Sequence, residues 1–224
     1  MESALRRVRE AELICFDNDG TLFRSEEVAN PAIQRQFVRF VARHGLDLPP
    51  PDDAAILALT GSPGPVFYKE ILPPALRHLS QEFRDACIDE EVREVRERGR
   101  FFDGAESMLL DLRARGRRIA LVTNGGDRYI GAVAERLDYA RHLDGIYHFG
   151  KDGLQTKAAM IHRAIADLGG PAVMVGDRRS DREAAEETQV PFVGCSFGYA
   201  APDELDGVPL LARSIDDVRR WLLG

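Results

Sequence analysis

Short apolar runs recur along the chain, and amphipathic helical patterns fill the intervals between most of them. The predicted strands are 13–16, 118–122, 145–149, 172–175 and 191–194, with a weaker candidate at 209–211. The predicted helices are 105–115, 127–137, 155–168, 180–188 and 214–223. Because strands that alternate with helices form parallel sheets covered by helices, the pattern predicts a doubly wound, Rossmann-like α/β domain.

The alternation fails over residues 24–100, where the chain shows helix-like segments and no convincing strand. Proline-rich breaks such as 49–51 interrupt these segments. One stretch, 81–98, is dense in charge and is typical of a solvated helix with a narrow apolar stripe. We therefore expect an α/β core made of residues 1–23 and 101–224, with a helical cap domain of residues 24–100 inserted after the first strand.

Charge and hydropathy argue against two classes of partner. The 224 residues include 30 Lys plus Arg and 37 Asp plus Glu, a net charge of −7, and no concentrated basic segment, so we expect no nucleic-acid partner. The two longest uncharged stretches, Ala54–Tyr68 and Thr188–Pro202, are broken by Gly and Pro and are shorter than the roughly 20 apolar residues that span a bilayer. Residues 1–10 lack the pattern of a secretory signal. We expect a cytoplasmic monomer or homodimer with no membrane partner.

Two carboxylates follow the first predicted strand directly. Asp17 and Asp19 stand in the run Asp-Asn-Asp-Gly-Thr-Leu, at the strand end where open α/β sheets bind ligands. The next residue, Gly20, indicates a tight turn. Close carboxylates repel each other unless a cation or a proton lies between them, and hard oxygen ligands suit Mg²⁺. Taken alone, the same run also fits a turn or a calcium loop.

Polar groups follow two further predicted strands. Thr123 and Asn124 come after strand 118–122, and their hydroxyl and carboxamide suit a phosphate group. Asp177 follows strand 172–175, and Asp181 lies on the first turn of the next predicted helix. Each group also fits a helix N-cap. The coincidence of three such strand ends favours a functional site.

These motifs resemble those of the haloacid dehalogenase-like hydrolase superfamily, in particular its phosphatases with a helical cap, such as phosphoglycolate phosphatases. The resemblance covers most of the chain outside the insertion and is carried, in the expected order, by Asp17 to Leu22, Thr123-Asn124, a Lys at a helix start, and Gly176-Asp177 with Asp181. Two lysines are candidates for the Lys of the third motif. Lys157 opens the helix predicted at 155–168 and is favoured over Lys151, which lies in the preceding turn.

The resemblance implies a role for each motif. Asp17 would be the nucleophile that forms an aspartyl-phosphate, and Asp19 the general acid and base. Lys157, with Asn18, Thr123 and Asn124, would hold the phosphate. A Mg²⁺ ion would be bound by Asp17, Asp19 through its carbonyl, and Asp177, with Asp181 either as a further ligand or as a residue that orients the ligands.

The implied activity is that of a Mg²⁺-dependent phosphatase acting on a small phosphorylated metabolite, with a phosphoglycolate-like ester as the first candidate. Asp19 favours phosphoryl transfer over dehalogenation, because the dehalogenases of the superfamily lack this acid. A phosphomutase uses the same pair of carboxylates, so that alternative stays open. A non-enzymatic phosphate-binding protein that retains the fold is the other alternative.

Two cations are candidates for contact with the substrate. Arg24 departs from the usual family sequence after the first motif and lies where the insertion begins, so it is a candidate for binding an anionic group. The cap segment 60–69 is expected to face the substrate, and Lys69 in it is a candidate partner for a substrate carboxylate.

Overall fold

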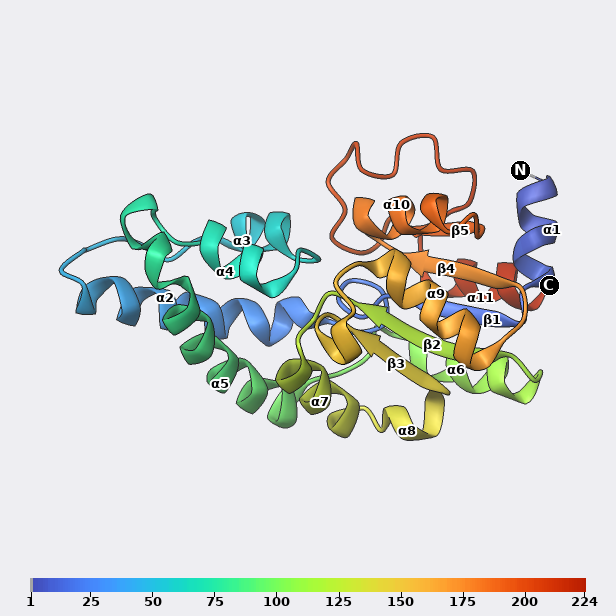
Figure 1. Ribbon diagram of the computed structural model, residues 1–224, viewed down its shortest axis with the longest axis horizontal. Helices are drawn as coiled ribbons and strands as arrows, with labels where there is room; N and C mark the ends of the chain where they lie inside the picture. The colour runs from blue at the N-terminus through green and yellow to red at the C-terminus, as the bar shows by residue number, and fades with distance from the viewer. Residues whose placement is uncertain (1) are drawn as a thin grey trace.

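A six-stranded parallel sheet forms the centre of the computed structural model, which describes residues 2–224 (Figure 1). The strand order is β3-β2-β1-β4-β5-β6, and every neighbouring pair is parallel. The strands are β1 (Leu13–Phe16), β2 (Arg118–Thr123), β3 (Gly145–His148), β4 (Ala172–Gly176), β5 (Phe192–Cys195) and β6 (Leu211–Ala212). Because the order runs outward in both directions from β1, the prediction of a doubly wound sheet is confirmed.

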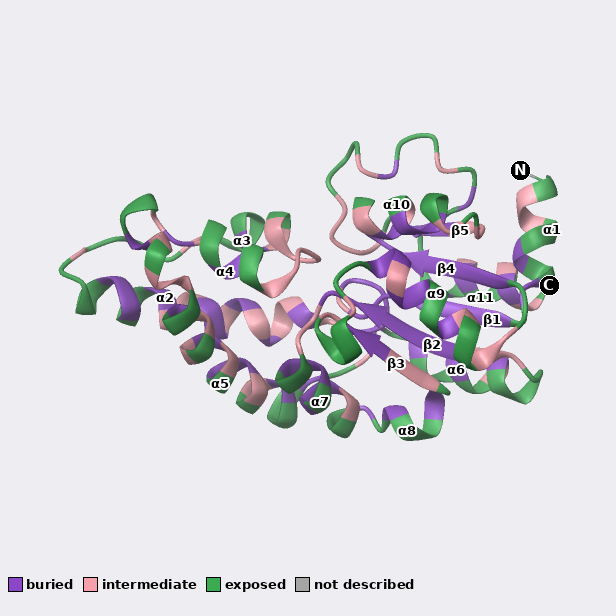
Figure 2. Cartoon of the chain, viewed as in Figure 1, coloured by how far each residue is buried: buried purple, intermediate pink, exposed green. Residues whose placement is uncertain are grey.

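Side chains of the sheet alternate between two apolar layers. In β1, Ile14 and Phe16 join one buried cluster, whereas Leu13 and Cys15 join the other. This follows from the period of two in a strand, and burial on both faces explains why the strands are continuous apolar runs. Figure 2 shows the strands as the most buried part of the chain.

The five predicted core helices are present, at α6 (Ala105–Ala114), α7 (Asp127–Arg136), α9 (Lys157–Leu168), α10 (Arg179–Glu187) and α11 (Ile215–Leu223). Helices α6, α7 and α11 pack on one face of the sheet, and α9 and α10 pack on the other. Two further helices were not predicted, α1 (Glu2–Glu10) and the short α8 (Tyr139–His142). Most residues of α1 are charged, and Val8 is its one buried residue. Its sequence therefore has little of the apolar periodicity that predicts a helix.

The inserted segment is helical and lies to one side of the sheet (Figure 1). It consists of η1 (Ser25–Glu27), α2 (Ala29–Arg43), α3 (Asp53–Leu59), α4 (Gly64–Glu70), η2 (Pro74–Leu79) and α5 (Ser80–Arg98). Its buried apolar side chains form a separate cluster around Phe40 and Phe83, whose ring centroids lie 5.1 Å apart. We call this helical unit the cap. Its limits at residues 24 and 100 remain a prediction.

Two linkers connect the cap to the core, and they run antiparallel beside each other. Arg24 N donates to Arg100 O at 3.2 Å, and Phe102 N donates to Leu22 O at 2.8 Å. Phe23 and Phe101 form an isolated antiparallel bridge between these two bonds. The chain therefore leaves and re-enters the core at one place.

None of the helices between residues 2 and 224 combines the length and the apolar character needed to cross a bilayer.

Candidate active site

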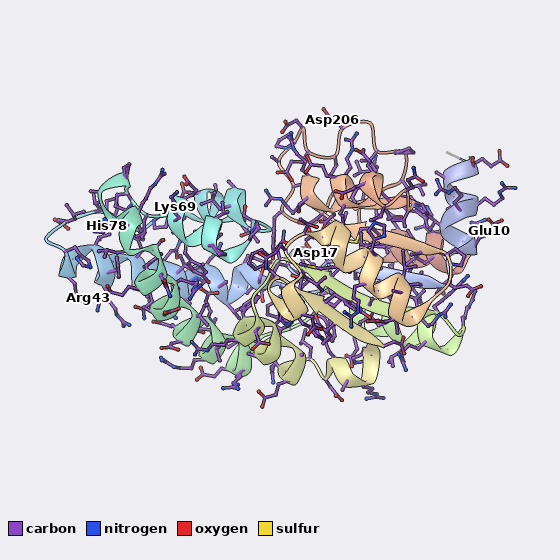
Figure 3. All side chains as sticks on the ribbon, in the orientation of Figure 1. Glu10, Asp17, Arg43, Lys69, His78 and Asp206 are labelled. Carbon is purple, nitrogen blue, oxygen red and sulfur yellow. The ribbon has the colours of Figure 1, made fainter. Side chains whose placement is uncertain are left out.

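Three of the sequence motifs meet at the carboxyl edge of the sheet. Asp17 follows β1, Thr123 ends β2, and Asp177 follows β4, so neighbouring parallel strands deliver them to one place. Asp17 N still donates to Val175 O of β4 at 2.9 Å, which fixes the backbone of the motif to the sheet. Figure 3 shows Asp17 where the core meets the cap.

A buried cluster of acidic side chains lies at this edge. Asp17, Asp177 and Asp181 are at most 2% exposed, and one carboxylate oxygen from each lies within 4.8 Å of the other two. Lys157 Nζ lies 2.9 Å from Asp17 Oδ2 and 2.5 Å from Asp181 Oδ1. Lys151 instead donates to the carbonyl of Ile146, so the structure brings Lys157 to the cluster and not Lys151.

The first turn of α9 explains the position of Lys157. Thr156 caps this helix, because its Oγ1 accepts from Ala159 N at 3.1 Å, and Lys157 is then the first helical residue. Asp181 has two roles on α10. Its Oδ2 accepts from Arg178 N at 2.9 Å as part of a helix cap, while its Oδ1 accepts from Lys157. The N-cap and the site interpretations of Asp181 are therefore compatible.

The cluster carries more negative than positive charge. Burial, and repulsion from Asp17 and Asp181, raise the pKa of Asp177 well above its usual value. Burial and repulsion from Asp17 raise the pKa of Asp181 to about 6, although Lys157 opposes this shift. Burial acts to lower the pKa of Lys157, but the attraction of Asp17 and Asp181 outweighs it and the pKa rises. Three carboxylates facing one ammonium group form a site suited to a cation.

Asp19 is not part of this cluster and lines the cavity described below. Its Oδ1 accepts from Tyr129 Oη at 2.7 Å and from Asn18 Nδ2 at 3.2 Å. Burial is the main cause that raises the pKa of Asp19 to about 6. The turn that follows needs Gly20, because its φ is +80° and a Cβ added there would lie 2.3 Å from Asp177 Oδ2.

A cavity of about 340 Å³ lies between the core and the cap. The core contributes Asp17, Asp19, Thr123 and Asn124 to its wall, among others. The cap contributes Asn30, Ile33, Ile56, Phe67, Tyr68 and Glu91, together with residues of the segment 60–65. Most of the cap segment expected to face the substrate thus lines the cavity.

The remaining phosphate-site candidates differ in where their side chains lie. Thr123 and Asn124 both line the cavity, and neither caps α7, whose N-cap is Gly126. Asn124 Nδ2 donates to Gly61 O of the cap at 2.8 Å, so core and cap are in direct contact at this point. Asn18 is fully buried, and its Oδ1 accepts from Tyr139 Oη at 2.7 Å.

The structure does not bring Arg24 or Lys69 to the cavity. The Arg24 guanidinium lies 4.6 Å from the centre of the Phe102 ring and 3.4 Å from Glu26. Lys69 is exposed on α4, where Phe67 and Tyr68 occupy the buried side of the helix. The expectation that these two cations face the substrate is therefore not supported by their positions.

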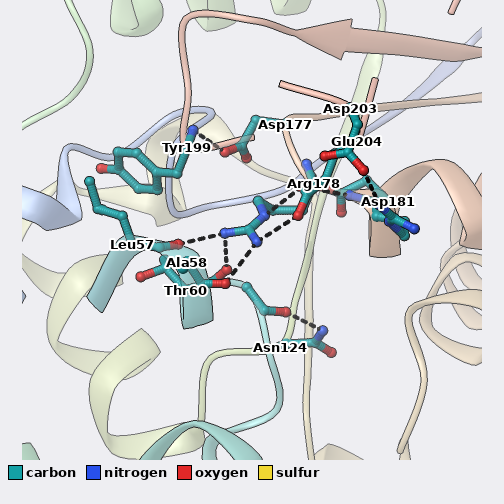
Figure 4. A network of polar contacts seen from close by, with 12 residues as sticks. Leu57, Ala58, Thr60, Asn124, Asp177, Arg178, Asp181, Tyr199, Asp203 and Glu204 are labelled. Carbon is teal, nitrogen blue, oxygen red and sulfur yellow. Dashed lines mark hydrogen bonds and ion pairs between the residues drawn. The ribbon is translucent and has the colours of Figure 1, made fainter. Parts of the chain in front are cut away.

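Arg178 is a site residue that the sequence analysis missed. Its guanidinium donates to the carbonyls of Leu57, Ala58 and Thr60 at the end of α3 in the cap (Figure 4). It also pairs with both carboxylate oxygens of Glu204, at 2.9 Å each. A residue between Asp177 and Asp181 thus holds the cap against the core. The sequence identified this loop as part of the site through Asp177. It did not indicate the role of Arg178, because the cap residues that Arg178 contacts are far away in sequence.

Glu91 was also missed, because the helix that carries it was expected to present its charges to solvent. Its side chain is instead buried, and the residue is 4% exposed. Glu91 Oε1 accepts from Tyr68 Oη at 2.9 Å. Burial is the main cause that raises the pKa of Glu91 to about 7, with a further contribution from repulsion by Asp19.

Comparisons with known proteins agree with this geometry. Residues 11–187 match the model of the haloacid dehalogenase-like hydrolase family. The chain belongs to this family. It is 30% identical over 206 residues to a 5′-nucleotidase of Pseudomonas aeruginosa, covering 86% of each chain. It is 28% identical over 231 residues to a phosphoglycolate phosphatase of Pseudomonas putida, covering 95% of this chain and 79% of that protein.

The fold of the family is shared with solved structures as well. A crystal structure from Haemophilus somnus, described as a predicted phosphoglycolate phosphatase, superposes with a TM-score of 0.82 at 18% identity. The superposition covers 94% of this chain and 97% of that one. The predicted superfamily and fold class are therefore confirmed, and the chain is a haloacid dehalogenase-like hydrolase.

We expect Arg178→Ala to loosen the cap. The substitution removes the bonds to three cap carbonyls and leaves Glu204, which is 12% exposed at its side chain, without its cation. The expected loss in the free energy of unfolding is about 3 kcal/mol. Hydrogen exchange should rise in residues 57–64. Arg179→Ala, at an exposed neighbouring arginine, is the control. Equal exchange in the two variants would contradict a holding role for Arg178.

We expect Glu91→Gln to change the pH dependence of stability. The pKa of Glu91 is about 7 in the folded state, and its ordinary value is 4.5. The folded state therefore keeps this proton up to a higher pH than the unfolded state does. Wild-type stability therefore falls, relative to the variant, as pH rises from 4.5 to 7, by up to about 3 kcal/mol. Urea unfolding at pH 5 and pH 8 measures this, with Glu97→Gln as the exposed control. If the difference in the free energy of unfolding between wild type and variant did not change with pH, burial would not shift the pKa of Glu91.

Proposed function

We propose that this hydrolase is a Mg²⁺-dependent phosphatase that releases phosphate from a small phosphomonoester through an aspartyl-phosphate. The observation that carries the proposal is the buried contact of Asp17 with Lys157, beside a second carboxyl group, Asp19, that faces the cavity. The 5′-nucleotidase and phosphoglycolate phosphatase names of the relatives support the same reaction class.

The first step transfers the phosphoryl group to Asp17. A carboxylate oxygen of Asp17 attacks phosphorus, a new P–O bond forms, and the ester P–O bond breaks. The leaving oxygen takes a proton from Asp19. The raised pKa of Asp19, about 6, keeps a protonated fraction available near neutral pH. Lys157 and the hydroxyl of Thr123 face the negative charge on the phosphoryl oxygens.

The second step hydrolyses the aspartyl-phosphate. Asp19, now ionised, takes a proton from a water molecule whose oxygen attacks phosphorus. The bond between phosphorus and the Asp17 oxygen breaks, which frees the carboxylate and releases inorganic phosphate. Tyr129 holds the Asp19 carboxyl in place in both steps, through its 2.7 Å hydrogen bond.

The donor set fits Mg²⁺. Asp17, Asp177 and Asp181 are hard oxygen ligands, and their charge exceeds that of Lys157. When bound, the ion would neutralise phosphoryl oxygens and lower the repulsion between phosphate and the carboxylates. Thr21 Oγ1 and Tyr199 N donate to Asp177, at 3.0 Å and 2.7 Å, and so orient its carboxylate for a ligand role.

The proposal includes a candidate substrate and leaves two alternative functions to be tested. A phosphoglycolate-like ester is the candidate that the sequence and the Pseudomonas putida relative favour. A phosphomutase would use the same two carboxylates and transfer the phosphoryl group to a sugar. A phosphate-binding protein without activity would have no need of an acid at Asp19.

We expect Asp17→Asn to abolish phosphate release, with a loss of roughly a thousandfold or more, because the amide is no nucleophile. Phosphate release from a panel of esters measures this, with Asp206→Asn at an exposed loop as the control. Removal of divalent cations with EDTA should stop turnover, and added Mg²⁺ should restore it. Release that survives Asp17→Asn would refute the covalent mechanism, and transfer to a sugar without release would favour the mutase.

A further inference from the structure

The cap wall of the cavity combines an apolar surface with one buried carboxyl group. Ile33, Ile56, Phe67 and Ile88 line it, and Phe149 of the core faces the same space. Apolar and aromatic walls with a few placed polar groups are typical of sites for small organic ligands, whose pockets span roughly 300–1,000 Å³. At about 340 Å³ the cavity lies within this range.

Glu91 is the buried carboxyl group in this wall. Its Oε1 is occupied by Tyr68 Oη, and its Oε2 has no hydrogen-bond partner among residues 2–224. Helix α5, which carries Glu91, packs against α7, whose Tyr129 holds Asp19. Glu91 and Asp19 both line the cavity. A hydrogen-bond acceptor of the cap thus lines the same cavity as the carboxyl group proposed to protonate the leaving oxygen.

The charges around the cavity disfavour an acidic leaving group. Within the described part of the chain, two cations line the cavity, and both are already paired, Arg84 with Asp85 at 2.8 Å and Arg128 with Asp89 at 2.5 Å. A carboxylate on the leaving group would also meet Glu91. A hydroxyl would instead donate to Oε2, the carboxylate oxygen that Tyr68 leaves free.

We propose, on the basis of the phosphatase function above, that Glu91 determines specificity by accepting a hydrogen bond from a hydroxyl of the leaving group. The preferred substrates are then phosphomonoesters of uncharged, hydroxylated compounds with a flat apolar part, the chemistry of a nucleoside 5′-monophosphate. The hydroxylated part contacts Glu91, and the flat part packs against Ile33, Ile56 and Phe67. A two-carbon acid such as glycolate offers neither group, so in this proposal the nucleotide replaces the phosphoglycolate-like ester as the preferred substrate.

The test compares four phosphate esters in the wild-type enzyme. These are adenosine 5′-monophosphate, its 2′,3′-dideoxy analogue, phosphoglycolate and p-nitrophenyl phosphate. We expect kcat/KM for the nucleotide to exceed that for phosphoglycolate at least about tenfold, and loss of the hydroxyls to lower it about tenfold, as for a hydrogen bond to a charged group. A higher kcat/KM for phosphoglycolate would overturn the proposal.

Variants of Glu91 then show whether the hydroxyl acts through this residue. In Glu91→Leu the ratio between the nucleotide and its dideoxy analogue should fall close to one, whereas Glu91→Gln, which keeps a polar group, should retain much of it. Glu97→Gln makes the same charge change at an exposed site of the same helix and should keep the wild-type ratio. An unchanged ratio in both Glu91 variants would overturn the assignment.

Failure of the underlying function gives a different result. If wild-type enzyme with Mg²⁺ releases no phosphate from any of the four esters, the phosphatase proposal fails, and the specificity proposal fails with it. If p-nitrophenyl phosphate is hydrolysed but the dideoxy analogue equals the nucleotide, only the specificity proposal fails.

Discussion

The packing of three carboxylates around one lysine is the constraint on which the rest of the site depends. Asp17, Asp177 and Asp181 come from two different segments of the chain, and only the parallel pairing of β1 with β4 brings them within reach of one another. Lys157 alone does not balance their charge. This arrangement stores repulsion in a folded protein, and the continuous apolar strands beneath it provide the stability that sustains it.

The residues that hold the cap are direct sequence neighbours of the proposed site residues. Arg178 stands beside Asp177 and binds carbonyls of the cap, and Asn124 stands beside Thr123 and binds Gly61 of the cap. Two of the strand ends that supply the site therefore also supply contacts to its cover. The same loops of the core therefore position both the site residues and the cap.

Much of the core was predictable, because buried parallel strands are apolar runs and polar residues at their ends stand out. Less of the cap was predictable. Glu91 and Glu97 lie in one charged helix, and only the packing of α5 against α4 and α7 distinguishes the buried residue from the exposed one. Arg178 has cap partners 118 to 121 residues away, beyond any local pattern. The roles assigned to the site residues remain predictions.

The two antiparallel linkers have a consequence for how such enzymes diversify. Since the chain leaves the core at Leu22 and returns at Phe102, directly beside it, the strands and their polar ends form a closed unit whatever is inserted between these points. Helices in the insertion can be lengthened, shortened or exchanged without moving a strand. The proposed reaction would then be encoded mainly in the stretches outside the insertion, and the proposed choice of compound largely within it.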